Sequence, residues 1–253
     1  MIKHIFTMVL LASITSPVFA GFKVETLSAL QMETWRVRMG FHQLAVRGNA
    51  PEDLDSLETV IHEGSEILKL LEVEAVTTSE KEAHSELLAL WDALGKRAVD
   101  NPLAAVGYAD FNAFSEINSL TLDLINELQS NMKAATPGEN DELIALGSKL
   151  LKISSEYIAL STFPSAGINT GTQEEAMAFS QEAMEFEMKL TALEKSGAGG
   201  DAAKRTLGTL KTRWAFIKGA IPQLDDPSAA KVPLLFYRYS SQTAEDLLAI
   251  TQQ

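Results

Sequence analysis

The chain has 253 residues, of which 46% are hydrophobic, and a formal net charge of −13 at pH 7. This acidic balance disfavours a general nucleic-acid-binding surface, which needs clustered lysine and arginine, so no nucleic-acid partner is expected. The absence of cysteine excludes disulfides, thiol catalysis, c-type haem attachment and cysteine-ligated metal.

The first twenty residues have the features of a secretory signal peptide. Lys3 precedes an apolar run at about residues 5–14, and the segment ends in Val18-Phe19-Ala20, which is typical of a cleavage site. The apolar run is too short to span a bilayer, which argues against a membrane anchor. We therefore expect residues 1–20 to be removed, Gly21 to become the N-terminus, and the protein to be periplasmic and soluble.

Four amphipathic helices are predicted in the first half of the remaining chain. The first covers about residues 24–46, and Pro51 opens the second. Ser79 and Glu82 are spaced as a capping box at the start of the third helix, and the fourth follows Pro102. Apolar residues recur every three or four positions along these helices. The predicted buried side includes Leu27, Leu30, Val37, Leu57, Leu68, Leu87, Leu88, Trp91, Leu94, Phe111, Phe114, Ile125 and Leu128.

Thr136-Pro137-Gly138 interrupts the pattern, and four further helices follow. The fifth is expected at about residues 141–162. The sixth carries Met177, Met184 and Met188 beside two phenylalanines at helical spacing. Methionines in that setting are typical of flexible core filling rather than of soft-metal binding, so we predict that all three are buried.

The second half repeats the first. Trp91 of the third helix corresponds to Trp214 of the seventh at an offset of 123 residues. The fourth helix corresponds to the eighth at an offset of 122, and the first to the fifth at an offset of 116. The offset is constant within a helix and changes between helices, as insertions in loops would cause. The sequence therefore predicts an all-α fold of two tandem up-down four-helix bundle repeats, covering residues 21–136 and 139–253.

Small polar residues interrupt the apolar faces of several helices. They are Thr34, Asn118, Thr121, Ser240 and Thr243. We interpret them as groups that hydrogen-bond to a nearby backbone carbonyl or fix the register between helices.

No catalytic or metal-binding constellation is evident. His42, His62 and His84 lie on three different helices, and a carboxylate-bridged di-iron bundle needs Glu-x-x-His on two helices. Thr59 and Lys81 stand where those glutamates would be. Neither a Gly-x-Ser-x-Gly elbow nor a phosphate-binding loop is present. We predict that the protein is not an enzyme and uses neither metal nor cofactor.

One polar stripe on the first helix is a candidate binding surface. Gln31, Trp35, Arg38 and His42 follow steps of four, three and four, and Arg36 lies beside them. Arginines next to an exposed tryptophan in an acidic protein suit an anion or an acidic partner, because the guanidinium donates two hydrogen bonds in one plane. The alternative is that Trp35 covers the edge of the core and both arginines pair with nearby acids.

Two segments resemble a known family. Leu30-Gln31-Met32-Glu33-Thr34-Trp35-Arg36 resembles the Leu-Arg-Met-x-Ser-Tyr-Arg signature in the first periplasmic helix of NarX-type nitrate sensors. Gly147-Ser148-Lys149-Leu150-Leu151 resembles the Gly-Ser-Leu-Arg-Met that opens that signature. The family is the PilJ/NarX-like N-terminal domain, also called the type IV pili methyl-accepting chemotaxis transducer N-terminal domain, and its fold is a four-helix bundle. The nitrate sensors bind the anion at a dimer interface through the arginine of Leu-Arg-Met. Gln31 and Leu150 stand at that position here, a departure that puts nitrate binding in doubt.

The resemblance implies an exported, non-enzymatic, sensor-like binding module. Its partner would be a small anionic ligand, or the outer domain of a membrane sensor, pilus or chemosensory protein, and the family's dimeric anion site makes a homodimer an additional expectation. The predicted binding residues are Gln31, Trp35, Arg36 and Arg38 in the first half and Lys149 and Lys152 in the second. The second hypothesis is a structural or assembly protein of the cell envelope or type IV pilus system, without a small-molecule ligand.

Overall fold

A computed structural model describes residues 21–100, 111–163, 166–168, 173–197, 200–224, 226 and 228–251. The predicted signal peptide lies outside these residues. The helices are α1 (Val24–Arg47), α2 (Pro51–Glu74), α3 (Thr78–Val99), α5 (Phe111–Met132), α6 (Asp141–Thr162), α7 (Gln173–Ser196), α8 (Asp201–Ile217), the 3₁₀ helix η1 (Lys218–Gln223) and α9 (Pro233–Thr251). No strand lies within the described ranges, so the prediction of an all-α helical bundle is confirmed. None of the helices described is long and apolar enough to cross a membrane.

The helix ends follow local sequence signals. Gly48, after the last residue of α1, takes a left-handed conformation with φ 63°, and Pro51 is the first residue of α2. The capping box of α3 is formed by Thr77 and Glu80, so the predicted pair two residues later is wrong. The pairs Thr77–Glu80 and Ser79–Glu82 have the same spacing. Glu80 forms the cap, and it also accepts a hydrogen bond from the amide of Val76 at 3.0 Å.

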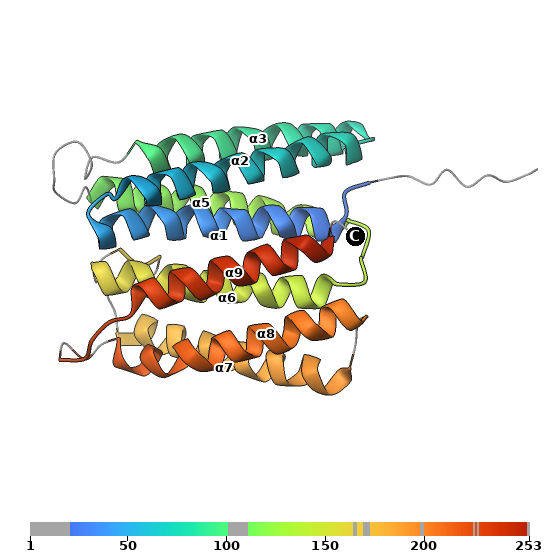
Figure 1. Cartoon of the computed structure of the whole chain (residues 1–253). Coiled ribbons are helices and arrows are strands. Elements are labelled where there is room, and N and C mark those ends of the chain that lie inside the picture. Colours follow the sequence, from blue (N-terminus) through green and yellow to red (C-terminus); the bar gives the residue numbers. More distant parts are fainter. Residues whose placement is uncertain are drawn as a thin grey trace, which may run out of the picture.

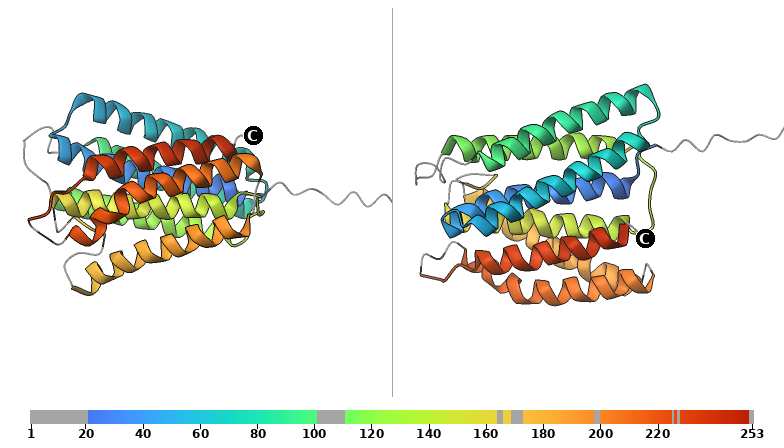
Figure 2. Two further views of the ribbon diagram at one scale, coloured as in Figure 1. Left: turned by 60° about the horizontal axis from the view of Figure 1, so that its bottom comes forward. Right: turned by 45° about the horizontal axis from the view of Figure 1, so that its top comes forward.

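The helices run roughly along one axis and stack in pairs. The pair α2 and α3 lies at one end of the molecule, followed by α1 with α5, then α6 with α9, and finally α7 with α8 (Figures 1 and 2). The helices α1 and α6 are therefore both interior, and they form the most extensive helix–helix packing in the described chain. They join the two halves of the molecule.

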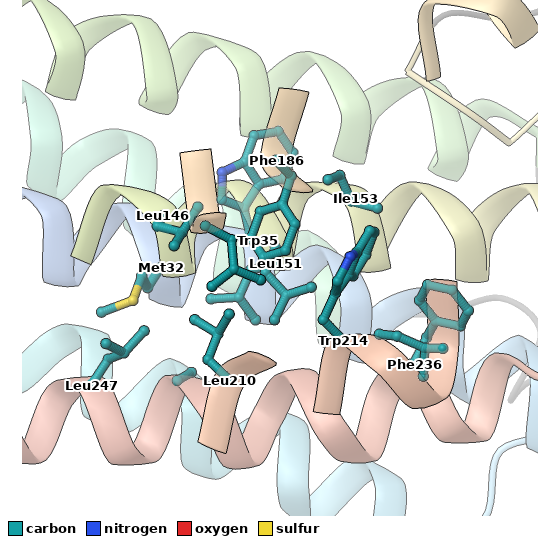
Figure 3. Close-up of a cluster of buried hydrophobic side chains, with 14 of the residues drawn as sticks. Met32, Trp35, Leu146, Leu151, Ile153, Phe186, Leu210, Trp214, Phe236 and Leu247 are labelled. Atoms are coloured by element: carbon teal, nitrogen blue, oxygen red, sulfur yellow. The ribbon is translucent and has the colours of Figure 1, made fainter. Parts of the chain in front are cut away.

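The packing around α1 is closed on almost all sides. Its predicted face, with Leu30 and Val37, enters the core of the first half. Its opposite face, with Met32, Trp35 and Met39, enters the core of the second half (Figure 3). Burying each of these three large side chains contributes about 1.5–3 kcal/mol. The two halves are thus held together by a shared hydrophobic core rather than by a surface contact.

Some residues predicted to be buried are exposed. Met184 and Met188 on α7 have exposed fractions of 61% and 64%, and Leu88 and Phe111 are also exposed. Each lies one or two positions from a buried residue of its helix, and one position is a rotation of 100° about the helix axis. The prediction that Met184 and Met188 fill the core is wrong; nothing is described of the Met177 side chain.

The polar residues on apolar faces behave in two ways. Thr34 and Thr243 donate to the backbone carbonyls of the residues four before them, at 2.8 Å and 2.7 Å, as predicted. Asn118 and Ser240 connect helices instead. Asn118 Oδ1 accepts from Arg38 Nε at 2.8 Å. Ser240 Oγ lies 2.5 Å from Ser154 Oγ. Thr121 has no hydrogen-bond partner among the residues described.

The loop between α5 and α6 is anchored to the start of α1. The amide of Val24 donates to the carbonyl of Thr136 at 3.0 Å, and the amide of Thr136 donates to the carbonyl of Phe22 at 2.8 Å. Further along the loop, the amide of Asn140 donates to Glu25 Oε1 at 3.2 Å. These bonds place the acidic start of α6 beside α1.

Candidate functional site

The stripe predicted on α1 is not a solvent-facing surface. Trp35 has an exposed fraction of only 3%, and Arg36 and Arg38 pair with glutamates, so the structure agrees with the alternative interpretation and not with an exposed tryptophan. Arg36 and Arg38 are also buried, and Gln31 is partly buried. The reason is the second half of the chain, which covers the side of α1 that the sequence pattern leaves outside the core. The binding role of these residues remains a prediction.

Arg36 lies among three carboxylates. Its Nη1 donates to both oxygens of Glu33, at 2.9 Å and 3.0 Å, and to Glu63 of α2 at 2.8 Å. Glu245 of α9 lies 3.8 Å from Nη2. Burial raises the pKa of Glu33 to about 7, because the loss of hydration outweighs the attraction of Arg36. The cluster joins α1, α2 and α9.

Arg38 has no exposed surface and binds four groups. It donates to Asn118 at 2.8 Å, to Ser155 Oγ at 2.7 Å, to Glu156 Oε2 at 3.0 Å and to the carbonyl of Ala166 at 3.3 Å. A guanidinium has five N–H donors, so these contacts use most of its capacity. Arg38 therefore fixes α1 to α5 and α6 rather than facing a ligand.

His42 is fully buried without hydrogen bonds to its ring nitrogens from any residue described. Its ring lies against Phe41 and Phe114, with centroid distances of 5.2 Å and 5.6 Å. Burial, with the nearby charge of Arg38, holds the pKa of His42 well below its usual range, so the ring is neutral. Within the described ranges no group of three or more His, Cys, Asp or Glu side chains is placed to hold a metal ion.

The two predicted lysines on α6 face α7. Lys152 binds Glu182 at 2.5 Å, and Lys149 binds Glu185 at 2.7 Å. Lys149 also lines a cleft of about 440 Å³ between the two helices. The lining residues are Glu142, Ala145, Leu146, Lys149, Lys189, Ala192, Leu193 and Ser196. The structure thus brings one predicted residue, Lys149, to a cavity together with Lys189, which the sequence did not single out.

A second cavity, of about 340 Å³, adjoins the cleft at the start of α6. It is lined by Gly138, Glu139, Asn140, Asp141, Glu142, Leu143, Leu193, Ala203 and Leu207. Glu142 and Leu193 line both cavities, so the two adjoin, and we call them together the α6–α7 groove. It has an apolar floor and charged rims.

The groove exists because α7 stands away from its neighbours. In the first half, Trp91 lies directly on Gly64 of α2, where an added Cβ would be 2.1 Å from the indole. In the second half, Trp214 of α8 instead meets Phe186 of α7, with the ring centroids 4.6 Å apart. The phenyl ring separates α7 from α8, and α7 packs less closely on α6 and α8 than α2 packs on α1 and α3.

Another cavity, of about 470 Å³, lies between α3 and α5. Its arginine, Arg97, is bound to Glu116 at 2.6 Å and to the carbonyl of Asp100 at 2.8 Å. In the α6–α7 groove, by contrast, Lys189 is exposed and makes neither a hydrogen bond nor an ion pair with any residue described. Lys96, which lines the α3–α5 cavity, is also exposed and has no such partner among the residues described, so the α6–α7 groove is preferred for another reason: two adjoining cavities with apolar side chains in their lining meet there.

Comparison of the sequence with protein-family models, with curated proteins and with solved structures finds no match. The resemblance to the PilJ/NarX-like domains therefore depends on the two motifs quoted above, and the function is argued from the α6–α7 groove.

Proposed function

We propose that the protein is an exported, non-enzymatic, sensor-like binding module of PilJ/NarX type, and that it binds a small, partly apolar ligand with an anionic group in the α6–α7 groove. One observation carries the proposal: two adjoining cavities, each with apolar side chains in its lining, meet at Leu193, and Lys149 and Lys189 line one of them. A concave, largely apolar site with a few charged groups is the usual form of a small-molecule site. The signal-peptide features of residues 1–20 support export to the periplasm.

The family's own anion site is a weaker candidate. Leu150, at one of the two positions of the family's arginine, has no exposed surface, and Gln31, at the other, is partly buried. The arginines nearest to that position are bound to glutamates and to other helices. A ligand on α1 would have to displace these contacts, whereas the α6–α7 groove is open.

We also infer that the halves are tandem up-down four-helix bundle repeats, with the boundaries given above. The contacts between helices support this inference. Arg38 binds Asn118 in the first half, and the corresponding residues in the second half, at offsets of 116 and 122, are Ser154 and Ser240, which also bind each other. The helices of Trp91 and Trp214 have corresponding neighbours. The ligand site then belongs to one repeat only, the repeat with the wider helix spacing.

The test is ligand screening by thermal shift with a blocked groove. A ligand that binds only the folded state at a concentration 100 times its Kd stabilises the protein by about 2.7 kcal/mol. Ala192 is an exposed residue that lines the groove, so Ala192→Trp should fill it. Ala89→Trp, at an exposed position of α3, is the matched control. Anionic amphiphiles should raise the melting temperature of the wild type and of Ala89→Trp but not of Ala192→Trp. Ligands that still stabilise Ala192→Trp would place the site elsewhere.

The second candidate is a structural or assembly protein of the envelope or of a type IV pilus system. The exposed apolar side chains of Leu70 and Val73 in the last turns of α2, and of Val76 just after it, favour this candidate. It predicts that Val73→Ser weakens association with a sensor or pilus partner, or with a second copy of this chain. Under this hypothesis Ala192→Trp leaves the association unchanged.

A further inference from the structure

The α6–α7 groove is polarised along its length. Lys149 and Lys189 lie at one end, and Glu139, Asp141 and Glu142 lie towards the other. With a rise of 1.5 Å per residue, the eight residues from Asp141 to Lys149 on α6 span about 12 Å. The apolar floor lies between the two charged ends. A ligand that fills the groove therefore meets opposite charges at its two ends.

The cationic end has an excess of positive charge. Lys149 binds Glu185 at 2.7 Å, and Lys189 is a further cation near the same carboxylate. The two lysines hold the pKa of Glu185 below its usual range, the hydrogen bond from Lys149 being the main cause. Glu185 therefore stays ionised and neutralises only one lysine. The second positive charge is available to a carboxylate of the ligand.

The lining of the acidic end carries negative charge only. None of the residues that line this cavity is basic. Asp141 accepts a hydrogen bond from the amide of Gly138 at 2.8 Å, and Glu25 of α1 adds a further carboxylate nearby. Burial, with the charge of Glu25, raises the pKa of Asp141, although the Gly138 amide opposes the shift. An anion or a plain acyl chain gains nothing here, whereas an ammonium group does.

We infer that the ligand of the groove is a short oligopeptide with free termini, about four residues long and rich in apolar side chains. An extended chain spans about 3.3–3.6 Å per residue, so about four residues match the separation of the charged ends. The carboxylate lies between Lys149 and Lys189, the terminal ammonium near Glu139 and Glu142, and the side chains on Leu146 and Leu193. The inference depends on the proposed function, because it names the ligand of the same groove.

The test uses calorimetric titration of the full chain, after signal-peptide removal, with four probes. They are a pool of tetrapeptides of alanine, leucine and valine with free termini, the same pool amidated at the C-terminus, the same pool acetylated at the N-terminus, and laurate. The free pool should bind, and each blocked pool should bind about tenfold more weakly, since each loses one charged contact. Equal affinity for free and blocked pools would overturn the inference.

Two lysine variants test whether the peptide carboxylate lies at Lys189. Lys189→Gln should weaken binding of the free pool about tenfold and leave binding of the amidated pool unchanged, because the two changes remove the same contact. Lys195→Gln, an exposed lysine of α7 that does not line the groove, should have no effect on either pool. If Lys189→Gln weakens both pools equally, the carboxylate does not lie at this lysine and the inference is wrong.

Laurate distinguishes a failure of the peptide inference from a failure of the proposed binding function. Suppose that laurate binds the wild type but not Ala192→Trp, and that the peptide pools do not bind. The peptide inference is then overturned, while the groove remains a binding site. If no probe binds and no anionic amphiphile stabilises the wild type, the proposed function fails as well.

Discussion

Glu33 is a carboxylate without exposed surface that shares one guanidinium with Glu63 and Glu245. Burial removes its hydration, and the single positive charge of Arg36 is divided among three negative ones. The hydration loss is the larger effect, so the pKa of Glu33 rises from its ordinary value of 4.5 to about 7. Glu33 therefore titrates in the neutral range, which makes it a site where pH acts on the junction of α1, α2 and α9.

This shift predicts that stability falls as the pH rises towards neutral. Between 4.5 and about 7 the folded state keeps a proton that the unfolded state releases, so its stabilising effect is complete below 4.5 and is lost as the pH rises through 7. The full change is at most about 3 kcal/mol. Urea unfolding at pH 5.5 and pH 8 measures it. Glu33→Gln should remove most of the difference, whereas Glu86→Gln, an exposed glutamate on α3, should keep it. An unchanged pH dependence in Glu33→Gln contradicts the assignment.

Arg38 predicts a second effect at the scale of one residue. Arg38→Ala leaves Glu156 and Asn118 without their buried partner, so the free energy of unfolding should fall by about 3–5 kcal/mol. Chemical denaturation gives this value. Arg213→Ala, which breaks the more exposed pair with Asp246, should cost less than about 1 kcal/mol. Losses of similar size in the two variants would show that Arg38 is not the anchor of the junction.

At the scale of the helix, the sequence predicts periodicity well and the surroundings of a helix poorly. The bounds of α6 agree with the prediction, and the end of α1 agrees within one residue, because Gly48 and Pro51 act locally. The sequence pattern predicts a binding stripe on the second buried face of α1, because that face carries arginines. A helix enclosed on all sides keeps its charged residues only if each is paired, and the partners Glu156 and Glu245 are distant in the sequence.

The α6–α7 groove could likewise not be predicted from local sequence patterns. Lys149 was predicted from its motif, but a cavity depends on the distance between helices, which no local pattern encodes. The signal that does exist lies in the comparison of the halves. Trp91 of α3 lies on Gly64 of α2, whereas Trp214 of α8 meets Phe186 of α7, and a large residue beside a tryptophan keeps two helices further apart than a glycine does. Lys189 and the acidic end of the groove follow from that spacing.

Glycine substitutions at a close helix contact and at an open position should have opposite effects on stability. Gly64→Ala places a Cβ 2.1 Å from Trp91, so either the indole or α2 must move, and stability should fall by about 1–3 kcal/mol. Gly208→Ala on α8 meets nothing within 4 Å and should raise stability by about 0.5–1 kcal/mol through the better helix propensity of alanine. Thermal and urea unfolding compare the two. A stabilising Gly64→Ala would show that α2 and α3 have room to separate.

At the scale of the whole molecule, the shared core makes the halves depend on each other. A fragment of residues 21–136 would expose Met32, Trp35 and Met39, which the second half covers in the complete chain. We expect this fragment to self-associate, and a fragment of residues 139–253 to restore a one-to-one complex when the two are mixed. Sedimentation velocity distinguishes these species. A monomeric first half that unfolds at the same temperature as the full chain would mean that the core is not shared.

Processing is a further property of the whole chain. N-terminal sequencing of the protein from the periplasm should begin at Gly21, because residues 1–20 have the order of a signal peptide. The cut would fall beside Phe22, which is buried and bound to Thr136. Recovery of a membrane-bound product that still begins with Met1 would remove the exported module from consideration.

The enclosure of α1 also has a consequence for synthesis. The ribosome makes α1 first, but the helices that cover its second face, α6 and α9, are made much later. At about 5–20 residues per second, the delay between the end of α1 and the end of α6 is on the order of ten seconds. During that time the nascent chain cannot complete its central core and stays open. On the proposed export route, a translocation channel that accepts only unfolded chains would receive this protein in the required state.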